Sequence, residues 1–173
     1  MTVWYIFELR INGIKPFEFI SKIKKCLIEG FRAGDSVVAV PTTVKYCEKN
    51  LNLPRRPLEV AISLGASTNM DAIILTETVL ILTFAGAEGM ELTPSKLLLI
   101  FFLILGTSFG VPTSAGSLTV VAMVILPTVG LDPALLTTVV FVEAIVNNFL
   151  SAFDVFGNVV AVKITDVIDQ RRS

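Results

Sequence analysis

The sequence contains no histidine, only two cysteines and few charged side chains. Of its 173 residues, 17% are charged and 53% are hydrophobic, whereas an ordinary soluble domain has about 25% and about 45–50%. Without histidine, with no Gly-rich phosphate loop and with too few cysteines for a metal cluster, an enzyme is the least favoured class. We expect Cys26 and Cys47 to be reduced thiols without a structural role.

The scarce charges are also unevenly placed. From Leu97 to Leu131 there are 35 consecutive residues without Lys, Arg, Asp or Glu. Because uncharged apolar runs of about 18 residues or more are typical of membrane-embedded segments, the sequence predicts an integral membrane protein in the lipid bilayer. The same run excludes a disordered chain, a nucleic-acid partner and most soluble folds.

The sign of the charge differs between the two ends of the chain. Residues 1–59 hold ten Lys/Arg and six Asp/Glu, whereas residues 60–173 hold four and nine. Basic loops next to apolar spans mark the cytoplasmic side. We therefore expect a multi-pass protein of the cell (inner or plasma) membrane, with basic loops and C-terminus in the cytoplasm.

Six segments follow from apolar runs, prolines and polar breaks. They are a remnant of a preceding span with a cytoplasmic loop (1–16), a first re-entrant hairpin (17–51), a transmembrane helix broken at Asn69–Asp71 (58–86), a second re-entrant hairpin (95–130), a last transmembrane helix (133–165) and a cytoplasmic tail (166–173).

The uncharged run has an awkward length, since one span needs about 20 residues and two need about 40 plus a turn. Its centre, Gly106 to Gly116, is rich in Gly, Ser, Thr and Pro, and irregular backbone does not face lipid. Two half-helices, 95–105 and 117–129, with their tip inside the membrane fit better than one span or two.

Basic residues flank the first hairpin, whereas Glu91 and Asp132 flank the second. The predicted fold is therefore an all-α membrane protein of two inverted units, each a re-entrant hairpin followed by a transmembrane helix, as in many secondary transporters. The alternative is two ordinary helical hairpins in a bundle.

Polar residues form a stripe on the last helix. At 100° per residue, Glu143, Asn147, Asp154 and Asn158 fall at about 0°, 40°, 20° and 60°, with Ser151 beside them at about 80°. A carboxylate at bilayer depth costs about 2.5–3.5 kcal/mol, so such residues persist when they face a bundle interior and bind an ion, a proton or a solute. The alternative is interhelical hydrogen bonding that holds the bundle together.

Asn69 and Asp71 interrupt the span 58–86. A carboxylate beside an amide and an unwound backbone suits a hard cation that prefers oxygen ligands. Glu77 lies on another face of this helix, and its role stays open.

Four motifs resemble those of the dicarboxylate/amino acid:cation symporters, the sodium-coupled glutamate and aspartate transporter family. They are Asn69-Met70-Asp71 preceded by Leu64-Gly65-Ala66, Gly110-Val111-Pro112, Asp154 to Asn158, and Val40-Pro41. The resemblance covers nearly the whole chain but only the C-terminal half of the family's fold, the half that forms the transport domain.

The resemblance implies coupling to sodium, a small organic solute, a trimer for the complete transporter, and a separate chain that carries the N-terminal spans. It places a sodium ion at Asn69, Asp71, Asp154 and Asn158. It implies solute-binding positions at Ser36, Val111, Pro112, Asn147, Ser151 and Asp154. Glu143 falls on the family's ion-pathway residue, or carries a proton.

The chain departs from the family at the solute site. Asn147 stands where the family has the Asp that binds the ammonium group, and Leu150 stands where it has the Arg that binds the side-chain carboxylate. Without a bidentate arginine a dicarboxylate loses its natural partner. We therefore expect a cation-coupled symporter, driven by sodium or protons, that does not bind acidic amino acids in the family manner.

The alternative function is a truncated, non-transporting remnant or an accessory subunit of a split transporter. Uptake by the chain alone would distinguish the two.

Overall fold

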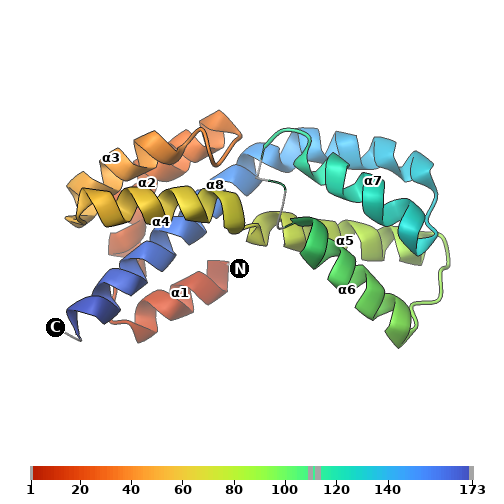
Figure 1. Ribbon diagram of the computed structural model, residues 1–173, viewed down its shortest axis with the longest axis horizontal. Helices are drawn as coiled ribbons and strands as arrows, with labels where there is room; N and C mark the ends of the chain where they lie inside the picture. The colour runs from red at the N-terminus through yellow and green to blue at the C-terminus, as the bar shows by residue number, and fades with distance from the viewer. Residues whose placement is uncertain (1, 109–110, 112–113, 172–173) are drawn as a thin grey trace.

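The computed structural model describes residues 2–108, 111 and 114–171, and this part of the chain contains helices but no strands. The helices are α1 (Thr2–Ile11), α2 (Pro16–Ala33), α3 (Val40–Leu51), α4 (Arg55–Thr68), α5 (Asp71–Ala87), α6 (Pro94–Ser108), α7 (Ser117–Val129), the 3₁₀ turn η1 (Pro133–Leu135) and α8 (Leu136–Gln170). The all-helical prediction is confirmed for these residues (Figure 1).

Helix α2 illustrates how the sequence dictates a helix. Its buried residues Phe19, Ile23, Cys26 and Gly30 recur every three or four positions, so they share one face. The helix ends at Gly34, whose φ of 60° suits a residue without a side chain. Asp35 then orders the turn toward α3, since its Oδ1 accepts the backbone N–H groups of Val37 at 2.8 Å and Val38 at 3.1 Å.

The chain packs as two halves that share α8. One core joins α1 to α4 with the second part of α8, where Val155, Phe156, Val159 and Val160 are buried. The other core joins α5, α6 and α7 with the first part of α8. Figure 1 shows the halves side by side along the long axis, with α8 running through both and α4 nearly in line with α5.

These packing halves differ from the units that the sequence suggests. The span predicted over 58–86 is two helices, α4 and α5, which separate at Asn69 and Met70 and contribute to different cores. The helix pair α2–α3 therefore shares a core with α4 but not with α5, and α6–α7 share a core with only the first part of α8.

Two predicted boundaries need correction. Helix α4 begins at Arg55 rather than at residue 58, because a proline such as Pro57 is tolerated in the first turn of a helix. Helix α8 continues to Gln170, five residues beyond the predicted end at 165. Bonds from Lys163 and Gln170 to the Asp166 carboxylate, at 2.7 and 3.1 Å, support this extra turn.

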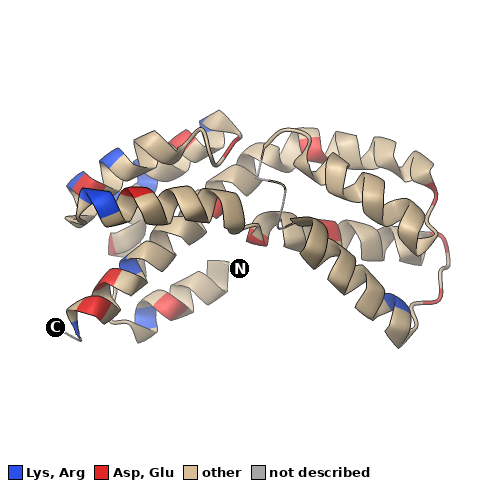
Figure 2. Cartoon of the chain, viewed as in Figure 1, with Lys and Arg blue, Asp and Glu red and all other residues tan. Residues whose placement is uncertain are grey.

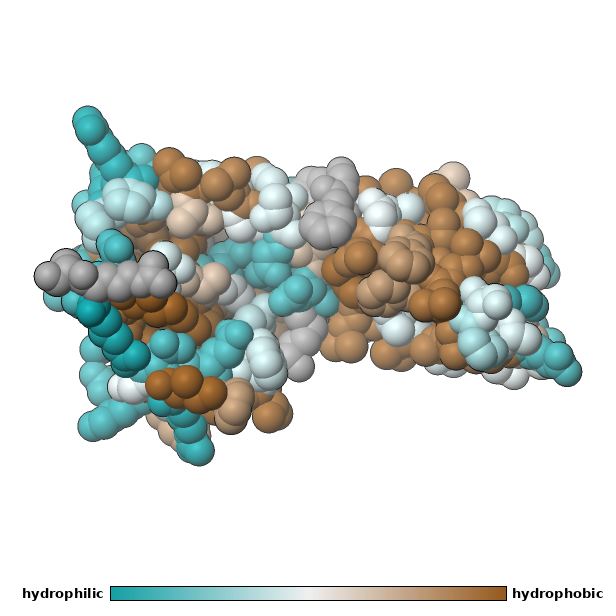
Figure 3. Space-filling model, turned by 60° about the horizontal axis from the view of Figure 1, so that its bottom comes forward, coloured by the Kyte–Doolittle hydropathy of each residue, from teal (hydrophilic) through white to brown (hydrophobic). Residues whose placement is uncertain are grey.

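Two helical segments of the described chain, Arg55–Ala87 and Pro133–Gln170, are long and apolar enough to cross a membrane, and α6 and α7 are shorter apolar helices. Lys and Arg residues gather at the α1–α4 end, while the opposite end carries mainly acidic residues (Figure 2). The surface over α5–α7 is mostly hydrophobic (Figure 3) and includes exposed Leu98, Phe101, Phe102 and Met123.

Candidate functional site

The helix break brings two predicted cation-site residues together. The Asn69 amide donates from Nδ2 to the Asn158 Oδ1 at 3.0 Å, and so joins the break to α8. The Asn158 side chain lies directly against Gly65 of α4, where an added Cβ would come within 2.5 Å of Asn158 Oδ1. Glycine at position 65 therefore permits the close approach of α4 and α8.

The other two predicted cation-site residues have partners elsewhere. Asp71, the first residue of α5, accepts a hydrogen bond of 2.5 Å at Oδ2 from the hydroxyl of Tyr5 in α1. Asp154 is buried and accepts the backbone N–H of Ala72 at 3.4 Å. The Asp154 carboxylate therefore faces the N-terminus of α5, where the helix dipole favours negative charge.

Glu143 faces the N-terminus of α7, as Asp154 faces that of α5. Its carboxylate accepts the backbone N–H groups of Leu118 at 3.0 Å and Thr119 at 3.2 Å, and the Thr119 hydroxyl at 2.6 Å. Glu143 thus caps the first turn of α7 from a neighbouring helix. Its predicted role in a proton or ion pathway stays a prediction.

Two predicted solute residues, Asn147 and Ser36, form hydrogen bonds at or beside the turn between α2 and α3. Asn147 donates from Nδ2 to the carbonyl oxygen of Gly34 at 2.8 Å. The Ser36 hydroxyl donates to the carbonyl of Ala66 at 3.3 Å, near the end of α4. The structure therefore joins both residues to backbone carbonyls, rather than leaving Asn147 with an uncommitted amide.

Of the remaining solute positions, Val111 and Pro112 belong to the predicted second hairpin and Ser151 belongs to α8. Val111 is half-buried against the α5–α7 core. Ser151 is fully buried, and its hydroxyl, like that of Ser108, has no hydrogen-bond partner among the described residues. Pro112, and Gly110 of the same motif, lie outside the described residues.

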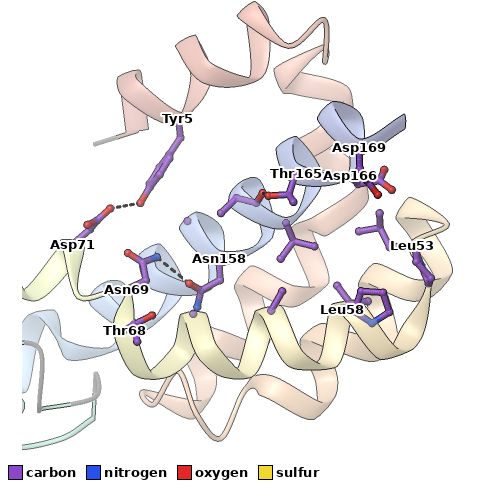
Figure 4. A pocket seen from close by; sticks show the side chains of 17 residues that line it. Tyr5, Leu53, Leu58, Thr68, Asn69, Asp71, Asn158, Thr165, Asp166 and Asp169 are labelled. Carbon is purple, nitrogen blue, oxygen red and sulfur yellow. Dashed lines mark hydrogen bonds between the residues drawn. The ribbon is translucent and has the colours of Figure 1, made fainter. Parts of the chain in front are cut away.

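A cleft of about 480 Å³ opens beside the helix break (Figure 4). Its polar end holds Tyr5, Asn69, Asp71 and Asn158, and its middle is apolar. Its far end is lined by Thr165, Asp166 and Asp169. The cleft extends between the break that separates α4 from α5 and the last turns of α8.

The described residues contain no group of three or more Cys, Asp or Glu side chains able to hold a metal ion. A cation held by the predicted residues would therefore rely on amide, hydroxyl and backbone oxygens besides the carboxylates of Asp71 and Asp154. Such a ligand set suits a hard monovalent cation such as sodium.

The sequence did not single out Tyr5, Thr119 or the environment of Glu77. Tyr5 reaches Asp71 across 66 positions of sequence, and no local pattern signals such a contact. Glu77 is fully buried in α5, and neither of its carboxyl oxygens has a partner among the described residues.

An all-helical chain with two membrane-length apolar helical segments, a break in one of them and buried carboxylates in the other has the features of a membrane transport protein. Its similarity to known sequences identifies the family. Residues 1–168 match the sodium:dicarboxylate symporter family, so the chain belongs to that family of membrane transporters.

Curated relatives cover nearly all of this chain. It is 24% identical to excitatory amino acid transporter 4 of Rattus norvegicus over 156 residues, which is 90% of this chain and 28% of that protein. It is 23% identical to the L-cystine uptake protein TcyP of Bacillus anthracis over 163 residues, which is 93% of this chain and 35% of that protein. The chain thus spans about a third of the length of these relatives.

Proposed function

We propose that this chain takes part in cation-coupled symport of a small organic solute across the cell membrane, with sodium as the first candidate for the coupled ion. One observation carries the proposal: at the helix break, Asn69 meets Asn158 of α8, and Asp71 lies two residues further along. Membership of a sodium:dicarboxylate symporter family supports it.

The physical chemistry of the break supports a cation. The C-terminus of α4 at Thr68 presents backbone carbonyls with partial negative charge, and Asp71 adds a carboxylate. Broken transmembrane helices of transporters bind cations with such ends. We assign the cation to Asn69, Asp71, Asp154 and Asn158.

For the solute we propose Ser36, Val111, Pro112, Asn147, Ser151 and Asp154 as contacts. Leu150 is buried and apolar where a side-chain carboxylate would need a cation, and Asn147 is already bonded to Gly34. The solute is therefore not an acidic amino acid bound through a carboxylate–arginine pair. Because TcyP is named for L-cystine uptake, L-cystine is the first solute to test.

In the bilayer, we propose that α2–α3 and α6–α7 are re-entrant hairpins of opposite orientation. The basic end formed by α1–α4 then faces the cytoplasm, which agrees with the charge distribution in Figure 2. A trimer, and a separate chain that carries further spans, are the assembly that the family resemblance implies.

Transport by the purified full chain in proteoliposomes tests the proposal. With an inward sodium gradient we expect uptake of labelled L-cystine above that in choline, and loss of that uptake in Asn69→Ala. The matched control is Asn12→Ala: Asn12 directly follows α1, and its side-chain amide donates to the Glu8 carbonyl of that helix at 2.9 Å. L-Aspartate and L-glutamate serve as competitors.

The outcomes distinguish the coupled ion, the solute and a chain that does not transport. Uptake driven by a pH gradient and independent of sodium would replace sodium by a proton. Saturable sodium-dependent aspartate binding would overturn the solute assignment. If the chain neither transports nor binds sodium, it is a non-transporting remnant or an accessory subunit.

A further inference from the structure

The ring of Tyr5 is anchored by packing that does not depend on the hydroxyl. The side chain is 8% exposed and packs edge-on against Phe156 of α8, with ring centroids 5.4 Å apart. An aromatic pair of this geometry is favourable without any polar contact. The anchored ring therefore holds the hydroxyl at a fixed position, from which it can donate a hydrogen bond.

The hydroxyl lies where three helices meet. It donates to Asp71 of α5 at 2.5 Å, and it rests over Gly157 of α8, where an added Cβ would lie 2.5 Å from Tyr5 Oη and 2.6 Å from Asn69 Nδ2. The tyrosine hydroxyl and the Asn69 amide therefore share the space above one glycine. Figure 4 shows Tyr5 extending from α1 toward Asp71, with Asn69 nearby in the break between α4 and α5.

Asp71 needs such a contact to keep one orientation. It is the first residue of α5 and is exposed to the cleft, so packing alone leaves its side chain several rotamers. A charge-assisted hydrogen bond from a buried, rigid donor selects one of them.

We propose that Tyr5 is a positioning residue of the cation site: its hydroxyl binds one oxygen of Asp71 and turns the carboxylate toward the Asn69–Asn158 pair. This inference rests on the proposed cation site. It makes α1 part of that site, because α1 supplies the donor that orients Asp71. Among the described residues that line the cleft at the break, Asp71 is the only one with a carboxylate.

The test is sodium binding by the full chain in nanodiscs, titrated against choline at constant ionic strength. Tyr5→Phe removes one oxygen and keeps the ring contact with Phe156. The matched control is Tyr46→Phe, since the other tyrosine of the chain packs beneath Lys25, with the ammonium 5.4 Å from the ring centroid. Thermal unfolding in choline reports stability separately from sodium affinity.

We expect Tyr5→Phe to raise the Kd for sodium by about tenfold or more, the usual effect of losing one hydrogen bond to a charged group. Tyr46→Phe should leave the Kd within about twofold. A lower unfolding temperature with unchanged Kd would show a merely structural role and overturn the inference alone. Absence of sodium binding by the wild type would instead overturn the proposed cation site.

Discussion

The two halves of the molecule bury polar groups in different ways. Where the α1–α4 half meets the start of α5, polar side chains bond to one another between different elements, as in the Tyr5–Asp71 and Asn69–Asn158 pairs. In the α5–α7 half, Glu143 holds the first turn of one helix, while Glu77 lies in the apolar core without a partner among the described residues.

Helix α8 explains why both arrangements exist. Glu143 and Asp154 are eleven residues apart, about three turns, so they lie on one face. Glu143 faces the N-terminus of α7, and Asp154 faces that of α5. One polar stripe thus supplies acceptors to the starts of two helices.

Removing the Glu143 carboxylate should have the largest effect on stability. Glu143→Ala leaves the N–H groups of Leu118 and Thr119 without their acceptor, which we expect to lower the free energy of unfolding by about 3 kcal/mol. Unfolding by SDS titration in detergent measures this change. Glu143→Gln keeps one acceptor oxygen and should lose less, and equal losses in the two variants would contradict the capping role.

The next largest loss of stability should come from adding a methyl group at Gly157, beneath Tyr5 and Asn69. Gly157→Ala places a methyl group 2.5 Å from Tyr5 Oη, which should cost about 2 kcal/mol. The control is Gly106→Ala in α6, where nothing lies within 4 Å of the added Cβ. Since alanine favours helix by about 0.8–1.0 kcal/mol over glycine, the control should be neutral or stabilised. The same unfolding titration measures both variants. If Gly157→Ala is as stable as Gly106→Ala, the two halves tolerate an added methyl group equally.

Replacing Glu77 should act in the opposite direction. Its carboxyl group is fully buried and its oxygens have no partner among the described residues, so Glu77→Met should raise the free energy of unfolding by about 1–2 kcal/mol. Glu91→Met in the exposed loop should stay within about 0.5 kcal/mol. Destabilisation by Glu77→Met would mean that the carboxyl group has a structural partner.

The smallest effect should come from the charged surface of the first half. Lys22 and Glu18 form an exposed ion pair of 2.9 Å one turn apart on α2. Lys22→Ala should lower the unfolding free energy by less than about 0.5 kcal/mol. The loss should shrink further in high salt, and a salt-independent loss would argue against an electrostatic origin.

Much of the fold was predictable because it depends on local periodicity. The wheel of α8 placed Glu143, Asn147, Asp154 and Asn158 on one face, and all four are buried. The break at Asn69 and the start of α7 at Ser117 followed from polar and Gly-rich positions. The start of α4 and the end of α8 were missed, because terminal turns depend on weak local preferences.

The candidate site was predictable only in part. The sequence identified Asn69, Asp71, Asp154 and Asn158 as polar groups that needed partners, and it pointed to the family. It did not show that Tyr5 would bond to Asp71, or that Asn147 would bond to Gly34 at a separation of 113 residues. It also left the purpose of Glu77 open.

The sequence by itself therefore determined the helices, their apolar faces, the membrane character and the family. The tertiary structure alone decided which buried polar group meets which, because these contacts depend on helices that lie far apart in the chain and approach over glycines such as Gly65 and Gly157. A helix repeats every 3.6 residues whatever surrounds it, whereas a side-chain partner exists only once the helices have packed.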